Sequence, residues 1–347
     1  MKNKQMWLGL AISAVFLYLA FRKSDWSLIW SRVQETDLLY IVASLPLLAV
    51  IFLLRAVRWR HLLLPAGRPA FSSLVSAIMI GFMSLNLLPF RLGEFIRAYV
   101  LGRRASMSKT GVFATVMVER VLDGFTTLFL LLLVLFLRPL PESSRVGVWI
   151  QAFSYLALFI FVSAMVFLVL ARLRTDWIVR VLERILGRFP GLLGPVVRIV
   201  RAFAGGLDVL SDFRLFATSI GLSVLIWLTM AAWYWTLMFA FGAVGGSGMG
   251  GQVGFLGSVF VLVAIALGVM IPSSPGFVGP YEFACIMALT ALGVDTAGAE
   301  SYALVSHAAQ FIPITLIGLV YLYIENFSLR EVRSEGVRLK SEFEPPE

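Results

Sequence analysis

The sequence is poor in charge, cysteine and histidine. Only 14% of its 347 residues are charged, whereas 59% are hydrophobic, and the mean hydropathy is +0.89. Because soluble domains carry about 25% charged residues, this composition excludes an ordinary water-soluble domain and indicates a membrane protein. The single cysteine, Cys285, excludes a disulfide within one chain and a thiolate metal cluster. The two histidines, His61 and His307, form no usual zinc spacing, so we expect no metal.

Motifs for nucleotide binding and hydrolysis are absent too. No GxxxxGK[ST] loop is present, which argues against direct use of ATP, and neither HExxH nor GxSxG occurs. The sequence therefore predicts no cofactor. The net charge of +9 does not indicate nucleic-acid binding, because the basic residues lie beside hydrophobic runs, where cytoplasmic loops of membrane proteins collect lysine and arginine.

Long hydrophobic runs predict an all-α, polytopic membrane protein. A bilayer core of about 30 Å needs about 20 apolar residues in a helix. We expect six full spans, near Trp7–Phe21, Leu38–Leu54, Val121–Leu137, Trp149–Ala171, Leu215–Phe241 and Ala303–Tyr323. The first run is interpreted as a retained helix rather than a signal peptide, because Arg22 and Lys23 follow it without a small-residue cleavage site.

Basic residues cluster beside particular runs and predict the orientation. One group follows the second run and comprises Arg55, Arg58, Arg60 and Arg68. Seven arginines lie between positions 172 and 201, whereas the loop 242–252 carries no charge. By the positive-inside rule we expect the amino terminus, the basic loops and the carboxyl tail on the cytoplasmic side of the inner (plasma) membrane.

Three segments follow from these patterns. Residues 1–327 are expected to form a single transmembrane domain. Within it, 173–213 is expected to be an amphipathic cytoplasmic segment, lying either on the inner leaflet or on the protein's own cytoplasmic face. The tail, 328–347, has mixed charge and few aromatic residues, which predicts a polar, partly disordered cytoplasmic tail.

The stretch "NLLPFRLGEFIRAYVLGRR", which begins at Asn86, predicts a helix that turns back within the membrane. It follows the apolar run Phe71–Leu88 and contains Pro89. If that run crossed fully, the basic segment 91–109 would lie outside, against the charge rule. Re-entry from the cytoplasmic side avoids this conflict, and it requires a cavity or protein to satisfy the broken backbone.

The second half repeats this pattern. The apolar run Phe255–Ile271 leads into "SPGFVGPYEF", which shares with "LLPFRLGEF" a glycine shortly before Glu-Phe. We therefore expect two broken or re-entrant helical hairpins besides the six spans, and the alternative that each run spans stays open. Entry from opposite sides suits two inverted repeats, which place a transport site near the bilayer midplane.

A third polar group lies at the start of an apolar run. Glu119 and Asp123 share a helix face, and Arg120 lies three residues before Asp123. Each unpaired charge at membrane depth costs about 2.5–3.5 kcal/mol on insertion scales, so these groups must pair or meet water. A purely structural ion-pair cluster and a binding site both remain open.

These motifs resemble those of a known family. "RAVRWRHLL" at Arg55, "NLLPFRLGEFIRAYVL" at Asn86, "VMVERVLDGF" at Val116, "IPSSPGFVGPYEFA" at Ile271 and a late helix with His307 occur in its order. The family comprises flippase-like integral membrane proteins and includes the transmembrane region of lysylphosphatidylglycerol synthetases. The resemblance implies movement of a polar-headed lipid between leaflets, such as aminoacylated phosphatidylglycerol or a polyprenyl-linked glycan.

Lipid transport suggests roles for the charged residues. Arg91 and Arg97 present planar cations suited to a lipid phosphate. Glu94 and Glu282 would hold the two arginines apart when the site is empty, or would bind a cationic lipid headgroup. The expected substrate-binding residues are Asn86, Arg91, Glu94, Arg97, Glu119, Arg120, Asp123, Glu282 and His307. The expected backbone breaks are Pro89, Gly93, Pro275, Gly276, Gly279 and Pro280.

Two other function classes stay open. Glu282 and His307 would be the acid and base of a membrane-embedded lipid-modifying enzyme. Alternatively, the chain is a scaffold for an envelope lipid enzyme. We expect a transporter rather than an enzyme, with anionic or polyprenyl phosphate lipids as its partners and no nucleic acid. A separate lipid-synthesising enzyme and a homo-oligomer remain open as further partners.

Overall fold

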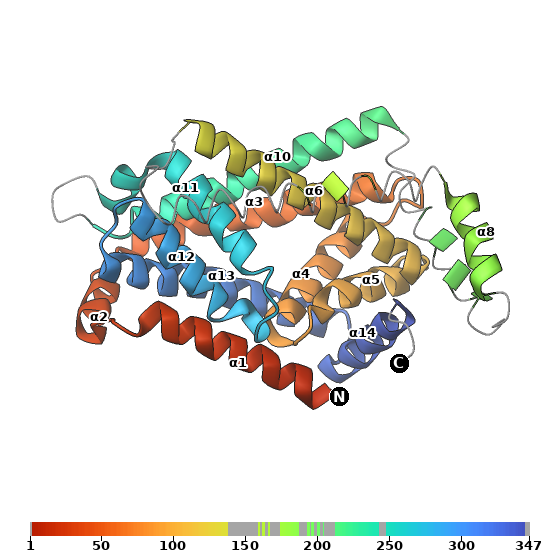
Figure 1. Ribbon diagram of the computed structural model, residues 1–347, viewed down its shortest axis with the longest axis horizontal. Helices are drawn as coiled ribbons and strands as arrows, with labels where there is room; N and C mark the ends of the chain where they lie inside the picture. Colours follow the sequence, from red (N-terminus) through yellow and green to blue (C-terminus); the bar gives the residue numbers. More distant parts are fainter. Residues whose placement is uncertain are drawn as a thin grey trace.

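The computed structural model describes residues 2–137, 174–186, 212–242 and 248–343, with scattered positions between 159 and 204. Every regular element in these ranges is a helix, which confirms an all-α, polytopic membrane protein (Figure 1). The helices long and apolar enough to span a membrane are α3 (Leu38–Leu63), α6 (Lys109–Leu137), α10 (Phe213–Met238), α11 (Gly248–Gly268) and α13 (Thr296–Ile324).

The amino-terminal run forms α1 (Lys2–Phe21), which continues into α2 (Trp26–Gln34) through a bend of 86°. Together these two helices make a sixth candidate span. The expected span Trp149–Ala171 lies almost entirely outside the described residues. Most of the segment 173–213 does too, although its amphipathic helix is present as α8 (Thr175–Leu186).

Two helical hairpins occupy the places where the sequence predicts broken helices. The first consists of α4 (Phe71–Leu87) and α5 (Leu92–Arg104). The second joins α11 to α12 (Pro280–Ala291) through a short 3-10 turn, η2 (Pro275–Phe277). In Figure 1, α4 and α5 lie in the half of the molecule that contains both chain termini, and α11 and α12 lie in the other half. The hairpins therefore approach each other from opposite ends.

The tip of the first hairpin follows from its proline. Pro89 has no backbone N–H and disfavours helical backbone at the residue before it. Leu88 is accordingly extended, with φ −112° and ψ 144°. Below the tip, α4 and α5 cross closely at Gly81 and Gly93. A Cβ on Gly93 would lie 2.2 Å from the carbonyl oxygen of Gly81, so only glycine fits there.

The contacts of α3–α6 and α10–α13 match those expected of two inverted repeats. At one end the Asp37 N–H, at the start of α3, donates to the Ala240 carbonyl just beyond α10, and near the other end Arg58 donates to Ser223. The two helices are thus antiparallel, and each has 26 residues. Two pairs of contacts cross between the halves, α4 on α13 and α11 on α6. Two matching contacts lie within the halves, α5 on α6 and α12 on α13. This arrangement supports the repeat predicted from the two glycine–glutamate motifs.

The carboxyl-terminal tail differs from the sequence prediction. Residues 329–343 form a helix, α14 (Leu329–Phe343), which packs on α5, so the expected disorder is wrong for this segment. Val332 and Leu339 are buried on its apolar face. Gly336 lets the two helices approach, because a Cβ there would lie 2.6 Å from Ile96. At its polar edge Glu331 pairs with Arg103.

Candidate functional site

A buried ion-pair cluster lies where α3, α5 and α6 meet. Arg58 is fully buried and pairs with Asp123 at 2.6 Å and with Glu119 at 3.4 Å. Arg97 reaches the other oxygen of Glu119 at 2.5 Å, and Arg55 approaches Asp123 at 3.7 Å. The predicted shared face of Glu119 and Asp123 is therefore present, and both carboxylates bind Arg58.

Arg55 and Arg58 do not lie in a cytoplasmic loop, as the charge pattern suggested. The helix α3 continues nine residues beyond the predicted apolar run, from Leu54 to Leu63, and carries both arginines into the protein. His61 also lies in its last turn, where Nδ1 contacts the carbonyl of Val57 at 2.8 Å. The helix continues because carboxylates distant in the sequence compensate the charges, and hydropathy alone cannot reveal such partners.

Arg97 and Glu94 have partners inside the protein. The Arg97 side chain is only 3% exposed, and its guanidinium lies 3.7 Å from the centre of the Trp59 ring as well as against Glu119. Glu94 lies 3.7 Å from Arg120, which also approaches Asp123 at 3.8 Å. The charge of Arg97, expected to await a ligand, is compensated by Glu119.

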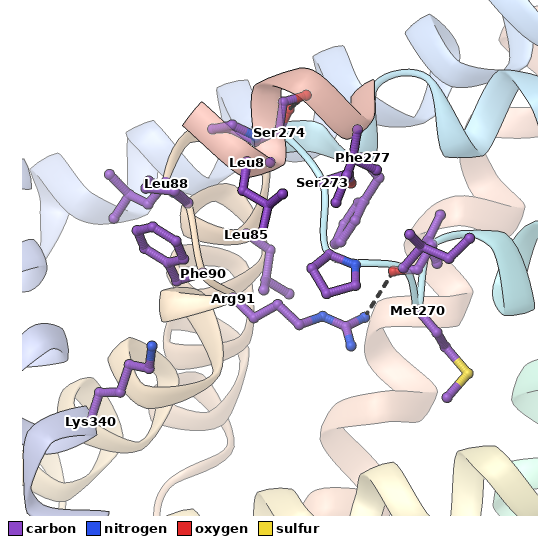
Figure 2. A pocket seen from close by; sticks show the side chains of 17 residues that line it. Leu8, Leu85, Leu88, Phe90, Arg91, Met270, Ser273, Ser274, Phe277 and Lys340 are labelled. Carbon is purple, nitrogen blue, oxygen red and sulfur yellow. Dashed lines mark hydrogen bonds between the residues drawn. The ribbon is translucent and has the colours of Figure 1, made fainter. Parts of the chain in front are cut away.

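A cavity of about 340 Å³ lies between the two hairpin tips (Figure 2). The first tip contributes residues 88–91, the second contributes 269–275 and Phe277, and α1 closes one side with Leu8, Gly9 and Ile12. Of the expected site residues, Pro89, Arg91 and Pro275 line it. Most of the lining is apolar, so the cavity joins a hydrophobic wall to a few polar groups.

Arg91 is the cation that links the two tips. Figure 2 shows its side chain extending from the first tip toward the chain near Met270 in the second. Its terminal nitrogen lies 3.4 Å from the Val269 carbonyl oxygen, and its guanidinium lies 5.6 Å from the Phe277 ring centre. The residue remains exposed, so its charge is accessible from the cavity.

Lys340 is a second cation on the same cavity. It comes from α14 and lies 5.2 Å from the centre of the Phe90 ring. Lys340 was not among the residues expected to bind a substrate, because the tail was expected to be partly disordered. The helical spacing of Val332, Gly336 and Leu339 was the sequence signal that could have predicted a helix here and so brought Lys340 to attention.

Glu282 and His307 brace the second tip rather than line the cavity. Glu282 accepts from the Gly279 N–H at 2.6 Å and contacts His307 Nδ1 at 2.5 Å. His307 Nε2 donates to the Gly276 carbonyl at 2.9 Å. Since that carbonyl can only accept, the close contact at Nδ1 needs a further proton shared between imidazole and carboxylate. Gly276 and Gly279 have positive φ, 74° and 98°, as the predicted tight path requires.

The remaining predicted residues complete the connections around the tips. Asn86 donates to Thr315 at 2.9 Å and so ties α4 to α13. Pro280 begins α12, and the Ser274 N–H of the second tip donates to Ser13 on α1 at 2.9 Å. Within the described part of the chain, no three His, Cys, Asp or Glu side chains gather to hold a metal ion.

The chain is similar to known membrane proteins over nearly its whole length. Residues 6–318 match the family model of the lysylphosphatidylglycerol synthase TM region. The chain is 26% identical to the glycosyltransferase AglD of Haloferax volcanii over 96% of its own length, but it spans only 56% of that relative. It is 25% identical to UPF0104 membrane proteins of Methanothermobacter thermautotrophicus and Pyrococcus horikoshii, covering 86% and 91% of those chains and 83% and 84% of its own. No solved structure matches it significantly.

Proposed function

Because the chain belongs to the family of the lysylphosphatidylglycerol synthase transmembrane region, we propose that it moves a polar-headed lipid between the leaflets of the cytoplasmic membrane. The observation that carries this proposal is the cavity between the hairpin tips, with Arg91 and Lys340 beside apolar walls. Two cations suit an anionic lipid phosphate, and the apolar lining suits the chains attached to it. The protein acts as a flippase or scramblase rather than as an enzyme.

Arg91 is the proposed phosphate ligand. A guanidinium offers a planar, permanently charged fork that matches two phosphate oxygens, which the ammonium of Lys340 cannot do. Among the described residues, Arg91 is held by one long hydrogen bond, to the Val269 carbonyl, and by the nearby Phe277 ring. A phosphate can replace that weak contact at little cost. Arg97 instead has a structural role, because Glu119 already compensates its charge.

The same arrangement supports an orientation for the protein in the membrane. Arg103 and Arg104 at the end of α5 pair with Glu331 and Glu325, near the carboxyl-terminal helix. Figure 1 shows both chain termini at one end of the molecule. Together with the positive-inside rule, this supports cytoplasmic termini and a first hairpin that enters from the cytoplasmic side.

The cargo belongs to the anionic phospholipids or the polyprenyl phosphate lipids. Both carry a phosphate for Arg91 and differ in the group beyond it. The similarity to a protein named as a glycosyltransferase keeps a glycosylated polyprenyl lipid among the candidates.

Reconstitution of the purified chain into vesicles tests this function. Fluorescent phospholipid and polyprenyl phosphate analogues are placed in one leaflet, and their arrival in the other is measured against protein-free vesicles. Transbilayer movement is expected without change of the headgroup. Turnover of the headgroup would instead favour a lipid-modifying enzyme, and neither activity would favour a scaffold.

A further inference from the structure

A second, smaller cavity lies at the junction of the two repeats. Its volume is about 20 Å³, and its lining includes Arg55 and Phe52 of α3, Phe82 of α4, Trp233 of α10 and Gln310 of α13. No residue that lines the tip cavity lines this one. A space of this size holds one particle about as large as a water molecule.

Two residues that line this cavity carry buried donors that make no hydrogen bond within the described part of the chain. Arg55 is 7% exposed, and its terminal nitrogen that lies 3.7 Å from the Asp123 carboxylate makes no hydrogen bond. Its other terminal nitrogen contacts only the sulfur of Met230, a weak acceptor, at 3.3 Å. Trp233 is 2% exposed, and its indole N–H has no partner either. Leaving such donors unsatisfied is costly, and two around one small space indicate a bound acceptor.

The charge beside this cavity is positive. Ion pairs within 4.0 Å join seven side chains into one network, comprising Arg55, Arg58, Arg97, Arg120, Glu94, Glu119 and Asp123. Four cations against three carboxylates leave one positive charge uncompensated. Arg55 is the arginine with the weakest compensation, since its carboxylate, Asp123, lies 3.7 Å away and is held more closely by Arg58.

We propose that this cavity binds a single small anion of the halide type, chloride, between Arg55 and Trp233. The anion accepts from both donors and neutralises the extra charge of the network. Water satisfies the site less well, because its two hydrogens need acceptors. The Gln310 amide oxygen, which accepts from Tyr234 at 3.4 Å, can take one such hydrogen, whereas Phe52 and Phe82 offer only ring faces. Water also carries no charge to neutralise the network. The anion would therefore stabilise the contact between the repeats.

Thermal unfolding of the detergent-purified protein tests the site. The Tm is measured in potassium chloride and in potassium gluconate at equal ionic strength. In chloride the Tm should rise by about 2 °C for each tenfold increase above the Kd, whereas gluconate, too large for the cavity, should have no such effect. In crystals soaked in bromide, an anomalous peak should appear between Arg55 and Trp233.

Three variants locate the effect. Arg55→Met removes both the donor and the extra charge, and it should abolish the chloride dependence. Trp233→Phe keeps a ring and removes only the N–H, so the apparent Kd for chloride should rise about tenfold. The matched control Arg103→Met, at the surface end of α5, should respond to chloride as the parent does.

Several results would overturn the proposal. Equal Tm values for the parent in chloride and gluconate would mean that water, and not chloride, occupies the cavity. A chloride response that survives in Arg55→Met would place the anion elsewhere. If Arg55→Met does not fold, an unchanged chloride affinity in Trp233→Phe decides against the site. None of these readouts depends on lipid transport.

Discussion

Phe90 and Phe277 adopt the same left-handed backbone conformation at the tips of the two hairpins, with φ of 63° and 61°. Positive φ is rare for a bulky residue and marks local strain. Each ring also lies beside a cation of the tip cavity, Lys340 for Phe90 and Arg91 for Phe277. The two tips thus share backbone geometry and chemistry, as repeats of one ancestral hairpin would.

The crossing of α4 and α5 predicts a steric effect at Gly93. Gly93→Ala should lower the free energy of unfolding by about 1–3 kcal/mol, because its Cβ would meet backbone atoms of Gly81 and Leu85 at 2.2 and 2.7 Å. Thermal unfolding measures the change. Gly221→Ala in α10 is the matched control, since its Cβ meets nothing within 4 Å and should be neutral or stabilising. Equal stability of the two variants would contradict the close crossing.

The pairing of Arg97 predicts a folding defect. Arg97→Ala should destabilise the protein by about 3–5 kcal/mol, because it leaves a buried Glu119 with less compensation. Chemical or thermal unfolding in detergent checks this. Arg91→Ala, on an exposed arginine, should change stability by less than about 0.5 kcal/mol. If Arg97→Ala is as stable as the parent but does not move lipid, Arg97 is a lipid ligand and not a structural residue.

The contact between Glu282 and His307 predicts that the second tip loses stability when the carboxylate is removed. Glu282→Gln keeps the shape and the acceptor for Gly279 but removes the carboxylate. The change should lower the free energy of unfolding by about 1–3 kcal/mol, because the close contact to the partly buried imidazole is lost.

The measurement is the Tm of parent and variant. The ring of His307 also stacks on Tyr281, with centroids 4.2 Å apart, and lies edge-on to Phe311, so it stays packed and the variant should still fold. A Tm equal to that of the parent would show that the contact between Glu282 and His307 does not stabilise the tip.

The re-entrant first hairpin predicts the side on which α5 ends. In intact cells, a thiol introduced by Arg104→Cys should not react with a membrane-impermeant reagent, because the proposed re-entry returns the end of α5, where Arg104 pairs with Glu325, to the cytoplasmic side. Gly242→Cys, in the uncharged loop beyond α10, should react. Cys285 is buried and does not interfere. Labelling at position 104 from outside would mean that α4 crosses the membrane.

Local sequence patterns predicted the hairpins well, because their causes are local. Pro89 ends α4 and disfavours a helical Leu88 whatever packs nearby. Likewise, Gly276 and Gly279 permit the positive φ of the second tip. The similarity of two short motifs, one in each half of the chain, predicted an inverted repeat, and the antiparallel pair α3 and α10 agrees with it.

The pairing of charges could not be predicted in the same way. Which arginine meets Glu119 depends on how α3 and α5 pack against α6, and Arg58 is 61 residues from its carboxylate. A hydropathy window also ends a helix at the first charge, and so it placed Arg58 in a loop. The proposed ligand role of Arg91 and the structural role proposed for Arg97 became distinguishable only when the burial and the partners of both side chains were known.

The central claim is that the cavity between the tips binds the lipid through Arg91. The rate of lipid scrambling by the Arg91→Ala protein in vesicles tests this claim most directly. We predict a rate about ten- to a hundredfold below that of the parent at equal amounts of folded protein, with partial recovery in Arg91→Lys. Arg103→Ala, on the same helix but away from the cavity, should scramble at the parent rate. If Arg91→Ala scrambles as fast as Arg103→Ala, the cavity between the tips is not the lipid site.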